Sequence, residues 1–219
     1  MIKAIPLLLA LAGSATMVPV AQAQDAAAGE KKAAMCIGCH GILGYRASFP
    51  EVHKVPMIAG QNAQYLQNAL LEYKKGERKH PTMRAIAVSL GEKDMADLAA
   101  YYETLGQGSV KTVAAAPAAP APSAEVQALL TKGNCASCHG ADFNKPIDGS
   151  YPRLAGQYAD YLYVALKAYQ IQGNPRIGRG NAIMVGQVSP FKHAELKALA
   201  NYIGALPGSM ATVPQARFR

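Results

Sequence analysis

The stretch MCIGCHG, residues 35–41, places two cysteines and a histidine within five consecutive positions. The stretch NCASCHG, residues 134–140, repeats this arrangement, and Cys135 follows Cys36 by 99 positions. All four cysteines of the chain fall inside these two C-x-x-C-H motifs. The two motifs therefore predict two copies of the same kind of site, one at each pair of thiols.

A zinc ion, a redox disulfide or a haem could occupy such a motif. Zinc needs about four nitrogen or sulfur ligands in a tetrahedron, and each motif offers three, with the histidine badly placed to close the same tetrahedron. A thioredoxin-like disulfide would follow a strand-rich segment, which neither motif does. In a c-type haem site the two thiols add to the vinyl groups of a haem and the next residue ligates the iron. We therefore predict two covalently bound haem c groups. The thioether-forming residues are Cys36, Cys39, Cys135 and Cys138, and the iron-ligating histidines are His40 and His139.

The two motifs open two copies of one folding unit. The segment AGQNAQYLQNALLEY (residues 59–73) aligns with AGQYADYLYVALKAY (155–169) at an offset of 96, and MADLAAYY (95–102) aligns with LKALANYI (196–203) at an offset of 101. An insertion in the second unit, around residues 171–181, accounts for the difference of five. Between the units lies VAAAPAAPAPS (113–123), which reads either as a semi-extended spacer or as an ordered strap across both domains.

Apolar periodicity predicts helices throughout, with no convincing alternating strand pattern. One helix covers residues 65–73 and stops at Gly76, a second covers 91–106 and stops at Gly106, and a third lies within 189–208. Each unit of about 80–85 residues has too little core to be stable alone, so a bound haem would supply the missing apolar centre.

Residues 1–23, MIKAIPLLLALAGSATMVPVAQA, have the layout of a secretory signal peptide, with cleavage expected after Ala23. The alternative is a transmembrane anchor, but the strongly apolar part is shorter than the ~20 residues that span a bilayer. The mature protein is therefore expected to be soluble and exported.

The formal net charge of +8 is distributed along the chain. No run resembles a nucleic-acid-binding arm, so we expect no nucleic-acid partner. A moderately basic surface favours an acidic protein partner or transient contact with an anionic membrane surface. The basic residues considered are Lys31, Lys32, Lys74, Lys75, Arg78, Lys79, Arg176 and Arg179.

The sixth ligand of each iron follows from the duplication. The candidates are Met57, His53, His80 and Met83 in the first unit, and His193, Met184 and Met210 in the second. Met57 aligns with Arg153, which cannot ligate iron, and His53 and His80 have no histidine counterpart. Met83 aligns with Met184, so we predict Met83 on haem 1 iron and Met184 on haem 2 iron. We expect Met57 in the core or at the haem edge, and the three histidines at the surface. Ligation by histidine and methionine closes both axial positions, which favours an electron carrier over a catalyst.

The two C-x-x-C-H motifs, the PMIAGQ and PRLAGQ stretches, the loop methionines and the terminal DLAAYY-like helices resemble the dihaem cytochrome c4 family. The resemblance implies an all-α fold of two tandem class I cytochrome c domains, related by a pseudo-twofold axis and each wrapped around a covalent haem. It further implies a periplasmic electron-transfer protein with no catalytic residues, which accepts electrons from a bc1-type complex or a dehydrogenase. The acceptor would be a cbb3-type or other terminal oxidase. Pro56 and Pro152 would accept hydrogen bonds from Nδ1 of His40 and His139.

Other functions stay open at this stage. The chain could be a cytochrome subunit bound to a periplasmic dehydrogenase, such as a flavocytochrome sulfide dehydrogenase, or a haem enzyme such as a peroxidase. We expect a monomer or weak dimer. The side chains of four tyrosines either hydrogen-bond haem propionates or pack against other side chains. These are Tyr45, Tyr73, Tyr151 and Tyr169.

The expected segments are a signal peptide (1–23), an N-terminal domain with haem 1 (24–108), a linker (109–124), a C-terminal domain with haem 2 (125–208) and a tail (209–219).

Overall fold

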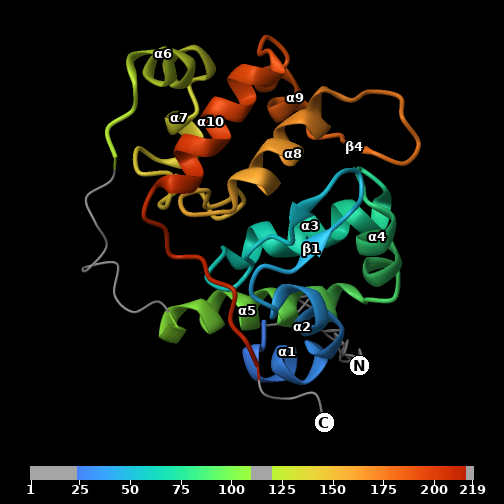
Figure 1. The fold of residues 1–219 in the computed structure, drawn as a ribbon. Helices are drawn as coiled ribbons and strands as arrows, with labels where there is room; N and C mark the ends of the chain where they lie inside the picture. The colour runs from blue at the N-terminus through green and yellow to red at the C-terminus, as the bar shows by residue number, and fades with distance from the viewer. Residues whose placement is uncertain (1–23, 110–119, 216–219) are drawn as a thin grey trace, which may run out of the picture.

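A computed structural model describes residues 24–109 and 120–215. The expected signal peptide and most of the expected linker lie outside the described residues. The chain forms two mainly helical halves, with the N-terminal half below the C-terminal half in Figure 1. The predicted all-α fold class is confirmed, and the strands that are present contain two residues each. Within the two described ranges, no helix is long and apolar enough to cross a membrane.

The N-terminal half contains five helices and three short strands among its described residues. They are α1 (Ala26–Lys32), α2 (Ala34–His40), β1 (Arg46–Ala47), β2 (His53–Lys54), α3 (Ala63–Lys75), β3 (Arg78–Lys79), α4 (Pro81–Val88) and α5 (Glu92–Ser109). Helix α3 ends where predicted, because Gly76 adopts the left-handed conformation with φ of 81°. The predicted stop of α5 at Gly106 is wrong, since the helix continues to Ser109. A glycine costs only about 1 kcal/mol inside a helix and does not forbid helical dihedrals.

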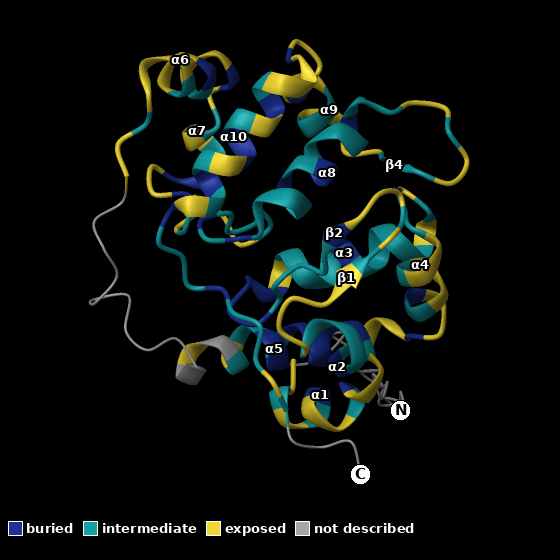
Figure 2. Ribbon diagram, in the orientation of Figure 1, coloured by how far each residue is buried: buried dark blue, intermediate teal, exposed yellow. Residues whose placement is uncertain are grey.

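The C-terminal half repeats the order of the main helices. Its elements are α6 (Ala124–Gly133), α7 (Ala136–His139), α8 (Ala159–Gln170), β4 (Gly178–Arg179), α9 (Ala182–Val188) and α10 (His193–Ala205). Helices α8, α9 and α10 thus correspond to α3, α4 and α5. Figure 2 shows buried residues concentrated in α5, α8 and α10, whereas α6 is mainly exposed.

Helix α1 lies directly against α5 in the core of the N-terminal half. A Cβ atom built on Gly29 would lie 2.1 Å from the carbonyl oxygen of Asp97, so only glycine permits this approach. The Asp97 carboxylate is fully buried and accepts hydrogen bonds from Lys32 Nζ (2.7 Å), Lys93 Nζ (3.0 Å) and the backbone N–H of Asp25 (3.0 Å). One carboxylate therefore ties the start of the domain to its last helix.

The expected insertion in the second unit joins the two halves. Strand β4 pairs antiparallel with β3 of the N-terminal half, with Arg78 opposite Arg179 and Lys79 opposite Gly178. Lys79 Nζ also donates to the carbonyl oxygen of Asn174 at 2.6 Å. Arg179 corresponds to Arg78 at the offset of 101, so equivalent strands of the two halves pair, and the inserted segment adds the Asn174 contact.

The C-terminal tail also crosses between the halves, as the red trace descending past α5 in Figure 1 shows. The N–H of Ala211 donates to the carbonyl oxygen of Ala59 at 3.0 Å, and Val213 packs against the N-terminal core. Gln215 donates to the hydroxyl of Tyr101. An ordered strap across both domains was considered for the linker, most of which lies outside the described residues. Residues 209–215 of the C-terminal tail, in contrast, do run across both halves.

Candidate functional site

The histidine of each C-x-x-C-H motif is fixed by a proline carbonyl. Nδ1 of His40 lies 2.9 Å from the carbonyl oxygen of Pro56, and Nδ1 of His139 lies 3.1 Å from that of Pro152. A carbonyl oxygen can only accept, so each Nδ1 carries the proton and each Nε2 keeps its lone pair. Nε2 is therefore the nitrogen that is free to ligate a metal.

Burial sets the protonation of these motifs. It lowers the pKa of His40 and of His139 below the usual range, because the charged imidazolium is poorly solvated there. Burial raises the pKa of the Cys36 and Cys135 thiols for the same reason. Both histidines are thus neutral imidazoles at neutral pH, the form that ligates iron. No cysteine is in a disulfide, so all four thiols are available for thioether bonds.

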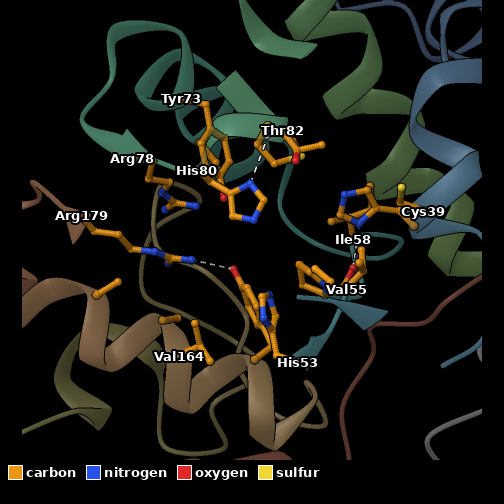
Figure 3. A pocket seen from close by; sticks show the side chains of 18 of the residues that line it. Cys39, His53, Val55, Ile58, Tyr73, Arg78, His80, Thr82, Val164 and Arg179 are labelled. Atoms are coloured by element: carbon orange, nitrogen blue, oxygen red, sulfur yellow. Dashed lines mark hydrogen bonds between the residues drawn. The ribbon is translucent and has the colours of Figure 1, made fainter. Parts of the chain in front are cut away.

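A cavity of about 760 Å³ opens beside the first motif. Cys36, Cys39 and His40 line it together with Met57 and Met83. Other parts of the N-terminal half also line it, including β1, α3 and α4, and the other half contributes residues 152–154, α8 and β4. Figure 3 shows the cavity with Cys39 at one side and Arg78, Arg179 and Tyr73 at the other. Its volume lies within the range of cofactor pockets, roughly 300–1,000 Å³.

Met83 and Met184 occupy the same place in two short helices. Met83 is the third residue of α4, and its N–H lies 3.4 Å from Nδ1 of His80, the N-cap. Met184 is the third residue of α9, and its N–H donates to Oδ1 of the N-cap Asn181 at 3.1 Å. Both methionines are half-buried. The N-cap residues therefore hold both methionines in equivalent positions.

The predicted haem 2 residues lie outside the lining of this cavity. His139 is buried, and Cys135 packs on a core cluster that contains Phe143 and Ile203. Met184 packs on a neighbouring cluster built around Leu199. The two clusters are joined by partly buried side chains that contact both, Leu130, Tyr163 and Leu166. The structure thus places Cys135 and Met184 on two adjoining cores of the C-terminal half.

A profile of the cytochrome c family matches residues 26–106 and 123–207, once in each half. Cytochrome c4 of Thiocapsa roseopersicina is 31% identical over 199 residues, which cover 84% of this chain and 94% of the relative. The chain belongs to the cytochrome c4 family. A solved cytochrome c4 structure from Acidithiobacillus ferrooxidans superposes with a TM-score of 0.60 at 26% identity, covering 80% of this chain and 99% of that one. The thiosulfate dehydrogenase electron acceptor of Stutzerimonas stutzeri is 31% identical over 209 residues, 88% of this chain and 92% of the relative.

Membership of this family decides the cofactor and the broad function. The protein is a dihaem electron-transfer cytochrome rather than an enzyme, and its partners are redox proteins. Each half carries one C-x-x-C-H motif, and these two motifs fit two covalently bound haem c groups. The cavity beside Cys36, Cys39 and His40 would give a haem bound at the first motif a mainly apolar surrounding.

Two expectations about the remaining candidate ligands are wrong. His53 was expected at the surface, yet it is 4% exposed, because its ring packs near Tyr161 of the other half and its Nδ1 contacts the carbonyl of Glu51. His80 is half-buried as the N-cap of α4, whereas His193 is exposed as expected. Met210 is buried between the halves of the cytochrome, where its sulfur contacts two glutamine amides rather than a haem pocket.

The four tyrosines considered for propionate contacts differ in position. Tyr45 is exposed, and the Tyr151 ring lies 6.3 Å from the His139 ring. Tyr73 lines the cavity of the cytochrome, and Tyr169 is buried. The last two lie beneath arginines, so packing against a cation is their observed role.

Arg78 and Arg179 are site residues that the sequence reasoning missed. They were counted among the dispersed basic residues, but Arg78 is 5% exposed and both line the cavity (Figure 3). Arg78 donates to the hydroxyl of Tyr65 at 3.2 Å, and Arg179 donates to that of Tyr161 at 3.0 Å. Their spacing of 101 equals the offset between Met83 and Met184, and this signal could have identified them.

The charges of these two arginines are matched differently by the described protein groups. Arg78 forms an ion pair with Glu72, with Nε 2.7 Å from Oε2, although the orientation does not meet hydrogen-bond geometry. Among residues 24–109 and 120–215, no carboxylate lies within 4.0 Å of Arg179. A cation inside a cavity is costly without an anion. The two carboxylates of a haem are anions that this cavity can accept.

Proposed function

We propose that this cytochrome carries single electrons in the periplasm, from a bc1-type complex or a periplasmic dehydrogenase to a cbb3-type or other terminal oxidase. The observation that supports this is the duplicated ligand set. Each half has a neutral histidine held by a proline carbonyl, two free thiols beside it, and a methionine held at the third position of a capped helix.

In this proposal His40 and Met83 ligate the first iron, and His139 and Met184 ligate the second. A haem iron supplies a one-electron redox couple, and ligation by histidine and methionine raises its reduction potential. Pro56 and Pro152 fix the orientation and basicity of the imidazoles through the Nδ1 contacts. The methionine sulfur keeps water and substrates from the sixth position, which suits transfer of electrons and no other reaction.

Arg78 and Arg179 hold and neutralise haem propionates in this scheme. They come from paired strands of the two halves and line one cavity, so both act on the region where the halves meet. Tyr65 and Tyr161 fix the two guanidinium groups by hydrogen bonds. The positive charges of the two guanidinium groups would thereby allow the propionate groups of the haems to stay buried.

The surface beside the first motif supports a protein partner. Exposed apolar side chains gather in the chain segment around it, with exposed fractions of 42% to 68%. They are Ile42, Leu43 and Val52, none of which lines the cavity. Lysines elsewhere on the surface would steer an acidic partner, so we expect the rate of oxidation of the cytochrome to fall as salt rises. A rate independent of ionic strength contradicts this docking scheme.

The visible spectrum of the reduced, matured protein, with and without carbon monoxide, tests the ligation. Unchanged haem bands are expected, because both sixth positions are closed. Binding of carbon monoxide by wild-type protein would overturn ligation by both methionines.

Cell fractionation and N-terminal sequencing test export and cleavage after Ala23, and light scattering tests the proposed monomer or weak dimer.

A second function is favoured by one comparison. The similar protein of Stutzerimonas stutzeri is named as a thiosulfate dehydrogenase electron acceptor, and it matches along almost its whole length. By this reading the cytochrome accepts electrons from a dehydrogenase that oxidises reduced sulfur. Purification of the native protein distinguishes the two functions, because a catalytic chain at fixed stoichiometry supports the subunit and its absence supports the free carrier.

A further inference from the structure

One peptide group in each half contacts both the histidine of a C-x-x-C-H motif and the opposite half. The carbonyl of Pro56 lies 2.9 Å from Nδ1 of His40, and the N–H of the same peptide, that of Met57, donates to Oε1 of Gln157 at 3.0 Å. Gln157 belongs to the C-terminal half. The peptide therefore joins a histidine of the N-terminal half to a glutamine of the C-terminal half.

The mirror arrangement is present. The carbonyl of Pro152 lies 3.1 Å from Nδ1 of His139, and the N–H of Arg153 donates to Oε1 of Gln61 at 2.9 Å. Pro56 and Pro152, Met57 and Arg153, and Gln61 and Gln157 are all related by the offset of 96. The pseudo-twofold relation between the halves thus produces two equivalent, reciprocal paths.

The orientation of each glutamine amide is determined by its neighbours. Oε1 of Gln157 receives the N–H groups of Met57 and Tyr158, both at 3.0 Å, while its Nε2 donates to the Met57 carbonyl at 2.9 Å. Oε1 of Gln61 receives the N–H groups of Asn62 and Arg153, at 3.0 and 2.9 Å. Backbone N–H groups can only donate, so the atoms that face them must be oxygens.

Both glutamines are inside the interface, each with 4% of its surface exposed. Hydrogen bonds in such surroundings are electrostatically stronger than in water, and successive bonds polarise one another. An acceptor on the N–H of a peptide increases the negative charge on its carbonyl oxygen. That oxygen then binds the Nδ1 proton of the histidine more strongly and makes the imidazole a more electron-rich ligand.

We infer that Gln157 and Gln61 are positioning residues that each tune the haem of the opposite half through the Pro56–Met57 and Pro152–Arg153 peptides. The inference rests on the proposed roles of His40 and His139 as axial ligands. Because an electron-rich imidazole stabilises ferric iron, each glutamine lowers the reduction potential of the haem across the interface. The potential of one haem therefore depends on a residue of the other half.

The test uses Gln157→Met and Gln61→Met in the full-length, matured cytochrome. Methionine fills similar space but accepts no comparable hydrogen bond from a backbone N–H. Gln157→Met should raise the potential of haem 1 relative to haem 2, with a roughly two- to fivefold change in the equilibrium between them. Gln61→Met should change this equilibrium in the opposite direction. Spectroelectrochemistry measures the potentials, and NMR of the reduced protein follows the Nδ1 proton of each axial histidine.

In the NMR spectrum, Gln157→Met should move the Nδ1 proton of His40 upfield and leave that of His139 in place. Gln157→Glu keeps an oxygen opposite the Met57 N–H, so its haem 1 potential should lie at or below the wild-type value. Met210→Leu is the matched control, because the hydrogen bonds of the Met210 sulfur are to Nε2 of the two glutamines, at 3.2 and 3.7 Å. This variant should leave the difference between the potentials unchanged.

Equal shifts of both haems in Gln157→Met, or the same shift in Met210→Leu, would mean that the glutamines only pack the interface, and would overturn the inference. An unchanged haem 1 potential in Gln157→Met would also overturn it. Failure of the proposed ligation has a different signature, since it would change the spectrum of the wild-type protein on addition of carbon monoxide.

Discussion

Arg78 and Arg179, one from each half, are direct partners in the antiparallel pairing of β3 with β4. Each guanidinium lies over two tyrosine rings of its own half, at 5.2 and 5.7 Å for Arg78 and at 5.7 and 5.4 Å for Arg179. Glu72 pairs with Arg78, whereas no carboxylate of the described residues lies within 4.0 Å of Arg179, so one positive charge beside the cavity is left without a protein anion. A haem propionate would supply the missing anion for Arg179, so loading of the cofactors and docking of the halves should stabilise each other.

Replacement of Arg179 by glutamine should lower the reduction potentials. A cation in the cavity favours the reduced haem, which carries less positive charge, and its loss should cost about 1–2 kcal/mol in the free energy of reduction. Potentiometric titration measures this change. Arg176→Gln, in the exposed part of the same segment, is the control and should have little effect. Equal shifts in the two variants would place Arg179 outside the cofactor site.

Replacement of Met83 or Met184 by leucine should open one iron to carbon monoxide and lower the potential of that haem, because the soft sulfur ligand is lost. Each variant should affect half of the haem absorbance. Met57 is the competing methionine, since it lines the same cavity as Met83. Met57→Leu should keep both irons closed, and an opened iron in that variant would transfer the ligand role to Met57.

Asp97 should make the protein sensitive to acid. Lys32 beside it holds the pKa of Asp97 at about 2, below the value of an unfolded chain. A depressed carboxyl pKa contributes stability that is complete above about pH 4 and is lost as pH falls toward about 2. Asp97→Asn should therefore lose about 1–3 kcal/mol at neutral pH and show a flatter decline between pH 4 and 2.

Thermal unfolding followed by circular dichroism at several pH values measures this effect. Asp94→Asn is the matched control, because Asp94 also pairs with Lys32 at 2.7 Å but is 39% exposed. Its effect should be smaller. An Asp97→Asn variant as stable as wild type at pH 7 would show that the buried carboxylate does not stabilise the α1–α5 contact.

Gly29→Ala should separate α1 from α5. The new methyl group would lie 2.1 Å from the Asp97 carbonyl oxygen and 2.7 Å from Cβ of Tyr101, so the helices must move apart, at a cost of about 1–3 kcal/mol. Gly186→Ala in α9 is the control, since a Cβ there meets nothing within 4 Å. It should raise stability slightly through helix propensity. Equal melting temperatures for Gly29→Ala and wild type would contradict this packing.

Much of the candidate site can be read from local patterns. The spacing of Cys36, Cys39 and His40 is set by one helical turn, and the duplication relates Met83 to Met184. Helix α3 and its stop at Gly76 follow from apolar periodicity and from the freedom of glycine at positive φ. These features depend on residues close together in the chain, which is why sequence reasoning reached them.

The burial of individual side chains could not be predicted from local sequence patterns in the same way. His53 and Arg78 carry polar side chains that favour the surface on average, yet both are buried because the other half covers them. Met210 looked like a possible ligand, but its sulfur accepts from Gln61 and Gln157 at the interface. The end of α5 was also misjudged, since a single glycine weakens a helix without ending it.

The sequence by itself determined the two attachment motifs, the duplicated helical units and the pairing of the predicted ligands, because all of these repeat at a fixed offset. Only the tertiary structure decided how the halves meet: β3 against β4, the tail across Ala59, and each glutamine against the peptide of the opposite half. Such contacts join residues about 90 to 150 positions apart and depend on shape and hydrogen-bond direction, which no local pattern encodes.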